Sequence, residues 1–146
     1  MIAAKLKLRG ADSWGDGSFK ASRGLDKNGD VKLHKGIDYA CLPGQEIMSP
    51  CVGQVTKLGY PYPYTSSGTN YRYVEITDLT GLKHRIFYIT PTVDLTQQVT
   101  VLDVIGISQD ISAKFHDPKR KPMINHVHVE VLGLDGEPIN PEGFHE

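Results

Sequence analysis

The chain has 146 residues, of which 39% are hydrophobic and 23% are charged, so it can bury a core and is predicted to form one globular domain over residues 1–146. Its formal net charge of −1, without a long basic run, argues against a nucleic-acid partner. No apolar stretch approaches the roughly 20 residues of a membrane span, and Met1 to Arg9 has no apolar core of signal-peptide length.

Short segments punctuated by glycine and proline predict strands, because no apolar stripe with a period of 3.6 residues is present. Residues 1–33 are polar and predict loops with at most one short strand. The fold class is therefore mainly β, an antiparallel sheet with long loops on one side. In chain order, the predicted strands are Gly36–Cys41, Gln45–Pro50, Gly53–Leu58, Tyr71–Leu79, Lys83–Pro91, Val99–Ser108 and His126–Gly133, and the main loops are Tyr60–Asn70 and Gln109–Asn125.

The two cysteines, Cys41 and Cys51, lie ten positions apart around predicted strands. Their number and spacing allow either a disulfide in an oxidising compartment or two buried thiols. The C-x-x-C spacing of a cysteine zinc site is absent.

The strongest chemical signal in the second half of the chain is His126-Val-His128-Val-Glu130-Val. The alternation places the valines on one face of a strand and the two histidines and Glu130 on the other. Residues two apart on a strand are separated by about 6.6–6.8 Å at Cα, so both imidazoles can reach one small site. Both could bind one metal, or one could bind while the other faces a water molecule. Glu130 is either a solvated carboxylate or an acceptor behind a histidine ligand.

The first half of the chain contributes His34-Lys-Gly36-Ile-Asp38. In a straight strand His34 and Asp38 would lie about 13 Å apart, too far to share one ion. Gly36 permits the bend that would bring them together. Three groups of the kinds that bind zinc, together with a spare imidazole as proton acceptor, suggest a catalytic zinc site.

These two strings resemble the signature of lysostaphin/LytM-type zinc metallopeptidases, which cut peptide bonds in bacterial cell walls. The resemblance covers roughly residues 17–140. It implies that His34, Asp38 and His128 bind one Zn²⁺ per chain and that His126 is the catalytic base. It also implies an antiparallel sheet with a groove that has the metal on its floor.

One position departs from that family. The family usually carries a further histidine in a Tyr-x-His-Leu string, and Thr90 occupies that position in the segment Phe87-Tyr88-Ile89-Thr90-Pro91. A missing donor of this kind costs about 10²–10³ in rate. Residues that could take its place in the transition state or the groove are Thr90, Tyr88, Tyr60, Tyr62 and Tyr64.

The string Phe87-Tyr88-Ile89-Thr90-Pro91, together with His126-Val-His128, is similar to the leukocyte cell-derived chemotaxin proteins. These proteins are relatives of the peptidases and act by signalling or binding. The first functional hypothesis is a zinc endopeptidase of peptidoglycan cross-links. The alternative is a zinc-stabilised binding module for a peptide, a glycan or a protein. A cell-wall substrate and no recognisable signal peptide together suggest action outside the cytoplasm by a periplasmic, phage-released or injected protein such as an endolysin.

Overall fold

The computed structural model describes residues 6–12, 14–25, 28–62, 70–115 and 117–144, and within these ranges the chain is built of strands and two short 3₁₀ helices. The prediction of a mainly β fold is confirmed. None of the described helices has the length and apolar character needed to cross a membrane. Both cysteines are thiols, and burial raises the pKa of Cys41 to about 11 and that of Cys51 to about 12.

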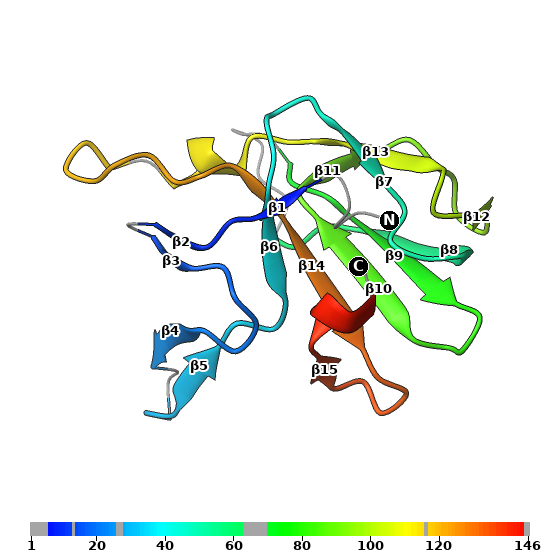
Figure 1. The fold of residues 1–146 in the computed structure, drawn as a ribbon, viewed down its shortest axis with the longest axis horizontal. Coiled ribbons are helices and arrows are strands. Elements are labelled where there is room, and N and C mark those ends of the chain that lie inside the picture. The colour runs from blue at the N-terminus through cyan, green and yellow to red at the C-terminus, as the bar shows by residue number, and fades with distance from the viewer. Residues whose placement is uncertain (1–5, 13, 26–27, 63–69, 116, 145–146) are drawn as a thin grey trace.

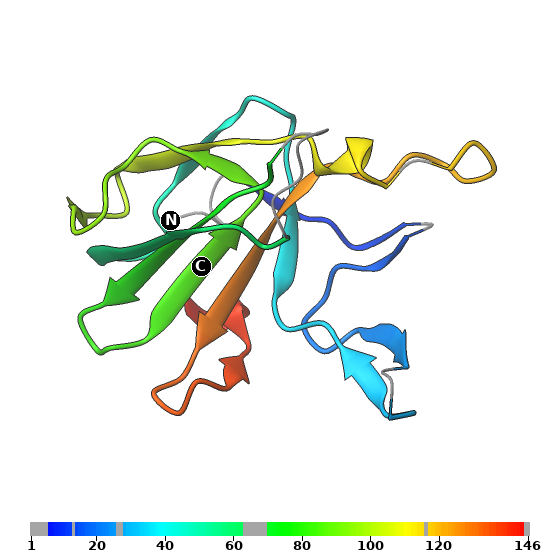
Figure 2. The same cartoon turned by 180° about the vertical axis from the view of Figure 1, so that it is seen from behind.

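Eight strands of the described part form the main antiparallel sheet (Figures 1 and 2). Their order is β1-β6-β14-β10-β9-β8-β12, and β15 pairs with β14 outside this path. The bounds are Lys7–Leu8 (β1), Ile37–Ala40 (β6), Gly53–Gly59 (β8), Tyr73–Asp78 (β9), Lys83–Phe87 (β10), Gln98–Val99 (β12), His126–Leu132 (β14) and Pro138–Ile139 (β15).

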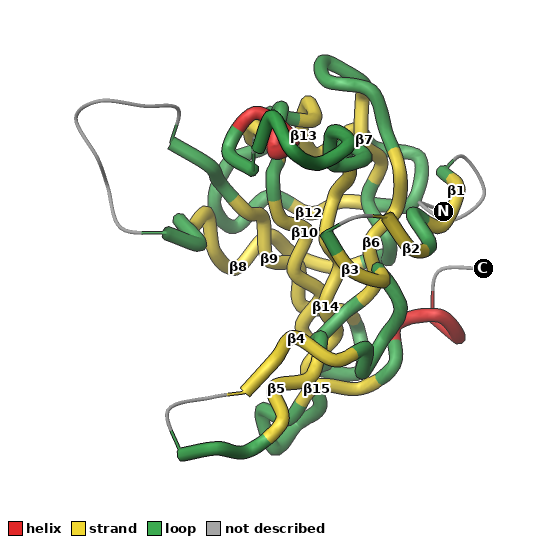
Figure 3. The backbone as a smooth tube through the Cα atoms, turned by 90° about the vertical axis from the view of Figure 1, so that its left-hand side faces the viewer, coloured by secondary structure: helices red, strands yellow, loops and turns green. Residues whose placement is uncertain are grey.

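Three smaller sheets complete the described fold. One has the order β11-β13-β7, and the other two are the hairpins β2-β3 and β4-β5, the latter projecting from the body of the molecule (Figure 3). The remaining elements are Ala11–Asp12 (β2), Gly15–Asp16 (β3), Ser22–Leu25 (β4), Val31–Leu33 (β5), Glu46–Met48 (β7), Ile89–Pro91 (β11), Val104–Ser108 (β13), Ile111–Ala113 (η1) and Pro141–Phe144 (η2).

The core lies on the apolar face of the main sheet. Strand alternation sends Val127 and Val129 of β14 into it, and Ile89 of β11 and Ile105 of β13 join the same buried cluster. The two sheets thus share one core, and the polar face of the main sheet stays available for the site.

Three predicted elements are wrong. The predicted strand Val99–Ser108 is two strands in different sheets, β12 and β13. The described part of residues 1–33 contains five short strands instead of at most one, because strands of two to four residues are too short to show an alternating apolar pattern. The predicted strand Lys83–Pro91 is two strands in different sheets, β10 and β11. Tyr88, between them, has φ 72°, a left-handed conformation that ends the pleat and turns the chain.

Candidate metal centre

The register between β6 and β14 brings Asp38 and His128 together. Their Cα atoms are directly paired, and paired residues of antiparallel strands share a face. His34 arrives from the connection between β5 and β6, where the chain bends so that His34 Nε2 lies 3.2 Å from Asp38 Oδ1. Only glycine fits at position 36, since a Cβ there would lie 2.0 Å from the carbonyl oxygen of Val129. The bend that the sequence suggests is therefore present.

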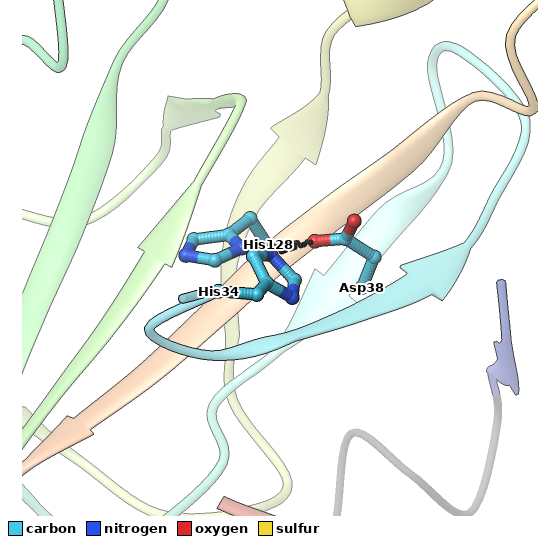
Figure 4. Close-up of side chains that lie close together, drawn as sticks. All are labelled: His34, Asp38 and His128. Atoms are coloured by element: carbon cyan, nitrogen blue, oxygen red, sulfur yellow. Dashed lines mark hydrogen bonds and ion pairs between the residues drawn. The ribbon is translucent and has the colours of Figure 1, made fainter. Parts of the chain in front are cut away.

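The three side chains converge on one point (Figure 4). His128 Nδ1 lies 2.9 Å from Asp38 Oδ1 and 2.9 Å from His34 Nε2. A tetrahedral zinc with ligands at about 2.0–2.2 Å separates its ligand atoms by roughly 3.3 Å, so this cluster needs little expansion to hold one. Two imidazoles and a carboxylate, all buried, are also a donor set that zinc accepts. These residues could therefore hold a zinc ion.

Hydrogen bonds behind the histidines set which nitrogen faces the centre. His34 Nδ1 donates to the carbonyl oxygen of Ser18 at 2.9 Å, and His128 Nε2 donates to Glu130 Oε1 at 3.0 Å. Because a carbonyl or carboxylate oxygen can only accept, the protons must lie on these outer nitrogens. The inner nitrogens, His34 Nε2 and His128 Nδ1, therefore face the shared point, where they could bind a metal ion in place of their present hydrogen bonds to Asp38 Oδ1.

Asp38 is held as an anion. Burial raises its pKa, but hydrogen bonds from His128 and His34 outweigh this and keep the pKa of Asp38 well below its ordinary value. Its second oxygen, Oδ2, accepts a 2.7 Å hydrogen bond from Arg9 Nη1. One carboxylate oxygen therefore faces the histidines while the other is bound by the guanidinium.

His126 stands beside this cluster. Its Nδ1 donates to the carbonyl oxygen of Ile124 at 2.8 Å, so its Nε2 lone pair faces the site, 3.6 Å from Asp38 Oδ2. Burial lowers the pKa of His126, although the nearby charge of Asp38 opposes this. The imidazole is therefore neutral near pH 7 and able to accept a proton.

A pocket of about 280 Å³ opens over the cluster. Tyr88 lines it, with its ring centroid 5.8 Å from that of His126 and its hydroxyl 3.3 Å from the hydroxyl of Tyr62. Trp14 and Phe115 form a further aromatic wall, with ring centroids 5.8 Å apart. A ligand in this pocket would meet both the three convergent side chains and several aromatic rings.

The other sequence-predicted residues lie elsewhere. Thr90 is exposed on β11, where it pairs with Ile107, and it does not line the pocket. Thr90 therefore does not face His126. The left-handed turn at Tyr88 directs that tyrosine, two positions earlier, into the pocket instead. Tyr60 is also outside the pocket, under the guanidinium of Arg72. Tyr64 lies outside the described residues.

Sequence reasoning missed Arg9 completely. It lies 29 residues before Asp38 in a segment without periodic signal, so only tertiary structure reveals their contact. Glu130 can be predicted from the sequence to share a face with His128, because the two residues are two apart on one strand. The sequence does not show that Glu130 accepts a hydrogen bond from His128. Trp14 and Phe115 come from predicted loops, for which sequence gives no placement.

Comparison with known proteins assigns the fold. No family model matches the sequence, and none of the curated proteins does. Solved structures do match. The catalytic domain of the antimicrobial peptidase lysostaphin from Staphylococcus simulans has a TM-score of 0.58 at 16% identity, over 92% of this chain and 90% of that chain. A zinc-containing peptidase from Vibrio cholerae has a TM-score of 0.57 at 22% identity, over 92% of this chain and 39% of that chain.

The same fold also occurs in a protein complex that is described as pore-forming and not as a peptidase. A chain of the SpoIIQ–SpoIIIAH pore-forming complex matches with a TM-score of 0.57 at 23% identity, over 84% of this chain and 71% of that chain. The fold is thus that of the lysostaphin-type peptidase domains, and the predicted architecture is confirmed. Identities this low establish the fold alone, so the activity has to be argued from the site.

Proposed function

We propose that this protein is a zinc-dependent endopeptidase of peptide cross-links in bacterial peptidoglycan, with one zinc per chain. The observation that carries the proposal is the convergence of His34 Nε2, Asp38 Oδ1 and His128 Nδ1, with the neutral imidazole of His126 beside them. Two solved structures with this fold, lysostaphin and the Vibrio protein, are described as peptidases.

Each residue has a distinct role in this proposal. Zinc, when bound, supplies a Lewis acid and lowers the pKa of water. His126 Nε2 accepts a proton from the attacking water and passes it to the leaving amine. The Tyr88 hydroxyl donates a hydrogen bond to the oxyanion that develops in the transition state. The aromatic walls and Tyr62 orient the substrate peptide. Because peptidoglycan lies outside the cytoplasm, the protein would act there, exported, phage-released or injected.

The test compares two histidine variants on purified peptidoglycan of several chemotypes. Zinc-loaded wild-type protein should release new amino termini, and a chelator should stop the release. His128→Ala should lose both zinc and cleavage, since it removes a ligand. His126→Ala should keep about one zinc per chain and still lose cleavage, because only the proton acceptor is missing. Zinc content is measured by elemental analysis.

The outcomes separate enzyme from binding module. Equal zinc loss in both variants would show that His126 is a ligand and overturn its assignment as the base. Full zinc occupancy in wild-type protein without cleavage of any chemotype would instead favour the chemotaxin-like alternative, a zinc-stabilised binding module, and the proposed activity would be abandoned.

A further inference from the structure

The side chain of Arg9 is buried beside the candidate metal centre and makes four hydrogen bonds with its five N–H groups. Its Nη1 donates to Asp38 Oδ2 at 2.7 Å. Its Nε and Nη2 grip the two oxygens of Asp12 at 3.0 and 2.7 Å, and Nη2 also donates to the carbonyl oxygen of Gly15 at 2.8 Å. The guanidinium thus binds two carboxylates at once, in a geometry that only arginine supplies.

Asp12 continues this network toward His126. Its Oδ2 accepts a 3.1 Å hydrogen bond from the backbone N–H of Ile124, and the carbonyl oxygen of Ile124 accepts the 2.8 Å bond from His126 Nδ1. Its Oδ1 accepts from the backbone N–H of Trp14 at 2.7 Å. One ion pair is therefore connected on one side to the carboxylate of Asp38 and on the other to the residue that anchors the His126 ring.

The ion pair between Arg9 and Asp12 is not explained by a contribution to folding stability. Arg9 and Asp12 have side chains only 3% and 8% exposed, and a buried ion pair is often no more stable than apolar side chains of the same volume. The pair instead fixes the orientation of the Asp38 carboxylate. Asp38 could present either oxygen to a metal or turn both toward it, and the bond from Arg9 to Oδ2 leaves Oδ1 as the oxygen facing His34 and His128.

We propose that Arg9 and Asp12 act together as positioning residues: Arg9 orients the metal-facing carboxylate of Asp38, and Asp12, through Ile124, orients the imidazole of His126. The proposal rests on the metal site of the proposed function, but not on peptide cleavage. In this proposal the segment from β1 to β3 supports the site, although the three candidate ligands, His34, Asp38 and His128, come from other elements.

The Arg9 half is tested by zinc affinity, measured by competition with a chromophoric chelator. Arg9→Gln should weaken zinc binding by about 10–100-fold, the usual effect of removing a partner behind a metal ligand. Arg23→Gln is the matched control. Arg23 lies 4.0 Å from the same Asp38 oxygen but is part-exposed and bonded to backbone carbonyls. It should change affinity by less than about fivefold.

A second variant covers the case in which Arg9→Gln does not fold. Arg9→Lys keeps the charge and loses the two-pronged grip on Asp12, so it should fold and still bind zinc more weakly than wild-type protein does. Circular dichroism and thermal melting confirm the fold of each variant. Wild-type zinc affinity in a folded Arg9→Gln or Arg9→Lys protein would overturn the role of Arg9.

The role of Asp12 is tested by measuring how fast the ring proton of His126 exchanges with solvent. In ¹⁵N-edited NMR of zinc-loaded protein, the Nδ1–H of His126 should be observed and protected from solvent exchange. Asp12→Asn removes the charge and one acceptor oxygen, so this proton should exchange faster, while kcat falls and KM is kept. Unchanged exchange in a folded Asp12→Asn protein would overturn the role of Asp12. The zinc-affinity and NMR readouts need only zinc and no cleavage. A protein that binds zinc and cuts nothing would therefore defeat the proposed activity and leave this inference standing.

Discussion

Tyr88 shows how much a single backbone conformation decides. Its φ of 72° costs about 1–2 kcal/mol for a residue with a side chain. Hydrogen bonds fix the backbone on both sides, from Tyr88 N to the carbonyl of Arg72 at 2.7 Å and from Gln109 N to the Tyr88 carbonyl at 2.8 Å. Burial and the neighbouring hydroxyl of Tyr62 raise the pKa of Tyr88, so it remains a neutral donor. The strained conformation places that donor in the pocket.

Tyr88→Phe should lower kcat by about 10²–10³ with little change in KM or zinc content, because it removes a hydrogen bond made in the transition state. Steady-state kinetics on a defined cross-link peptide measure the change. The control is Tyr71→Phe, since Tyr71 packs against the same ring but its hydroxyl bonds to the carbonyl of Asp110. Equal losses in both variants would point to packing and contradict a role for the Tyr88 hydroxyl.

Among the elements, β9 and β10 carry an ion pair between the buried Glu75 and the part-exposed Arg85 on the polar face of the main sheet. Glu75 accepts hydrogen bonds from Arg85 Nε at 2.7 Å and from Thr56 Oγ1 at 2.8 Å. Burial raises the pKa of Glu75, yet these two bonds outweigh it and lower the pKa below the ordinary value of 4.5. The register of β8, β9 and β10 is what brings these three residues together.

We expect the ion pair of Glu75 and Arg85 to make the folding stability of the protein fall in acid. A folded-state pKa below the unfolded one gives stability that is present above about pH 4.5 and lost as the pH falls through the folded value. Urea unfolding between about pH 3 and pH 7 should show that loss, and Glu75→Gln should make it shallower. Coincident pH profiles of the two proteins would contradict the contribution of Glu75.

Elements whose sequence shows an alternating pattern or a turn glycine can be predicted from the sequence alone. The alternation of β14 gives both its strand state and the shared face of His126 and His128, and Gly36 marks the bend before Asp38. Those residues meet in the structure because antiparallel pairing obeys the same alternation. The break between β10 and β11 is not visible, because a tyrosine at positive φ is held by Arg72 and Gln109, which are distant in sequence. The contact of Arg9 with Asp38 is hidden for the same reason.

At the scale of the whole molecule, the candidate metal centre joins parts of the chain that are far apart in sequence. His34 and Asp38 belong to the β5–β6 region and His128 to β14, 90 residues after Asp38. Unfolding would separate these ligands, so an ion bound to all three binds the folded state alone. Metal binding is therefore expected to be coupled to global stability.

Zinc should raise the Tm, and a chelator should lower it. At a free zinc concentration of about 100 times Kd, the stabilisation would be about 2.7 kcal/mol. Differential scanning calorimetry with and without zinc measures it. His128→Ala should be insensitive to both additions, while His126→Ala should respond like wild-type protein. A zinc-induced shift that survives in His128→Ala would mean that the ion binds elsewhere.

Strand β14 gives one face to the core and the other to the site, through Val127 and Val129 on one side and His126 and His128 on the other. For protein engineering, this division separates what must be kept from what can be varied. Trp14, Tyr62 and Phe115 wall the same pocket from outside the main sheet. A combinatorial library confined to those positions would redirect the choice of ligand while the strand preserved the scaffold and its chemistry.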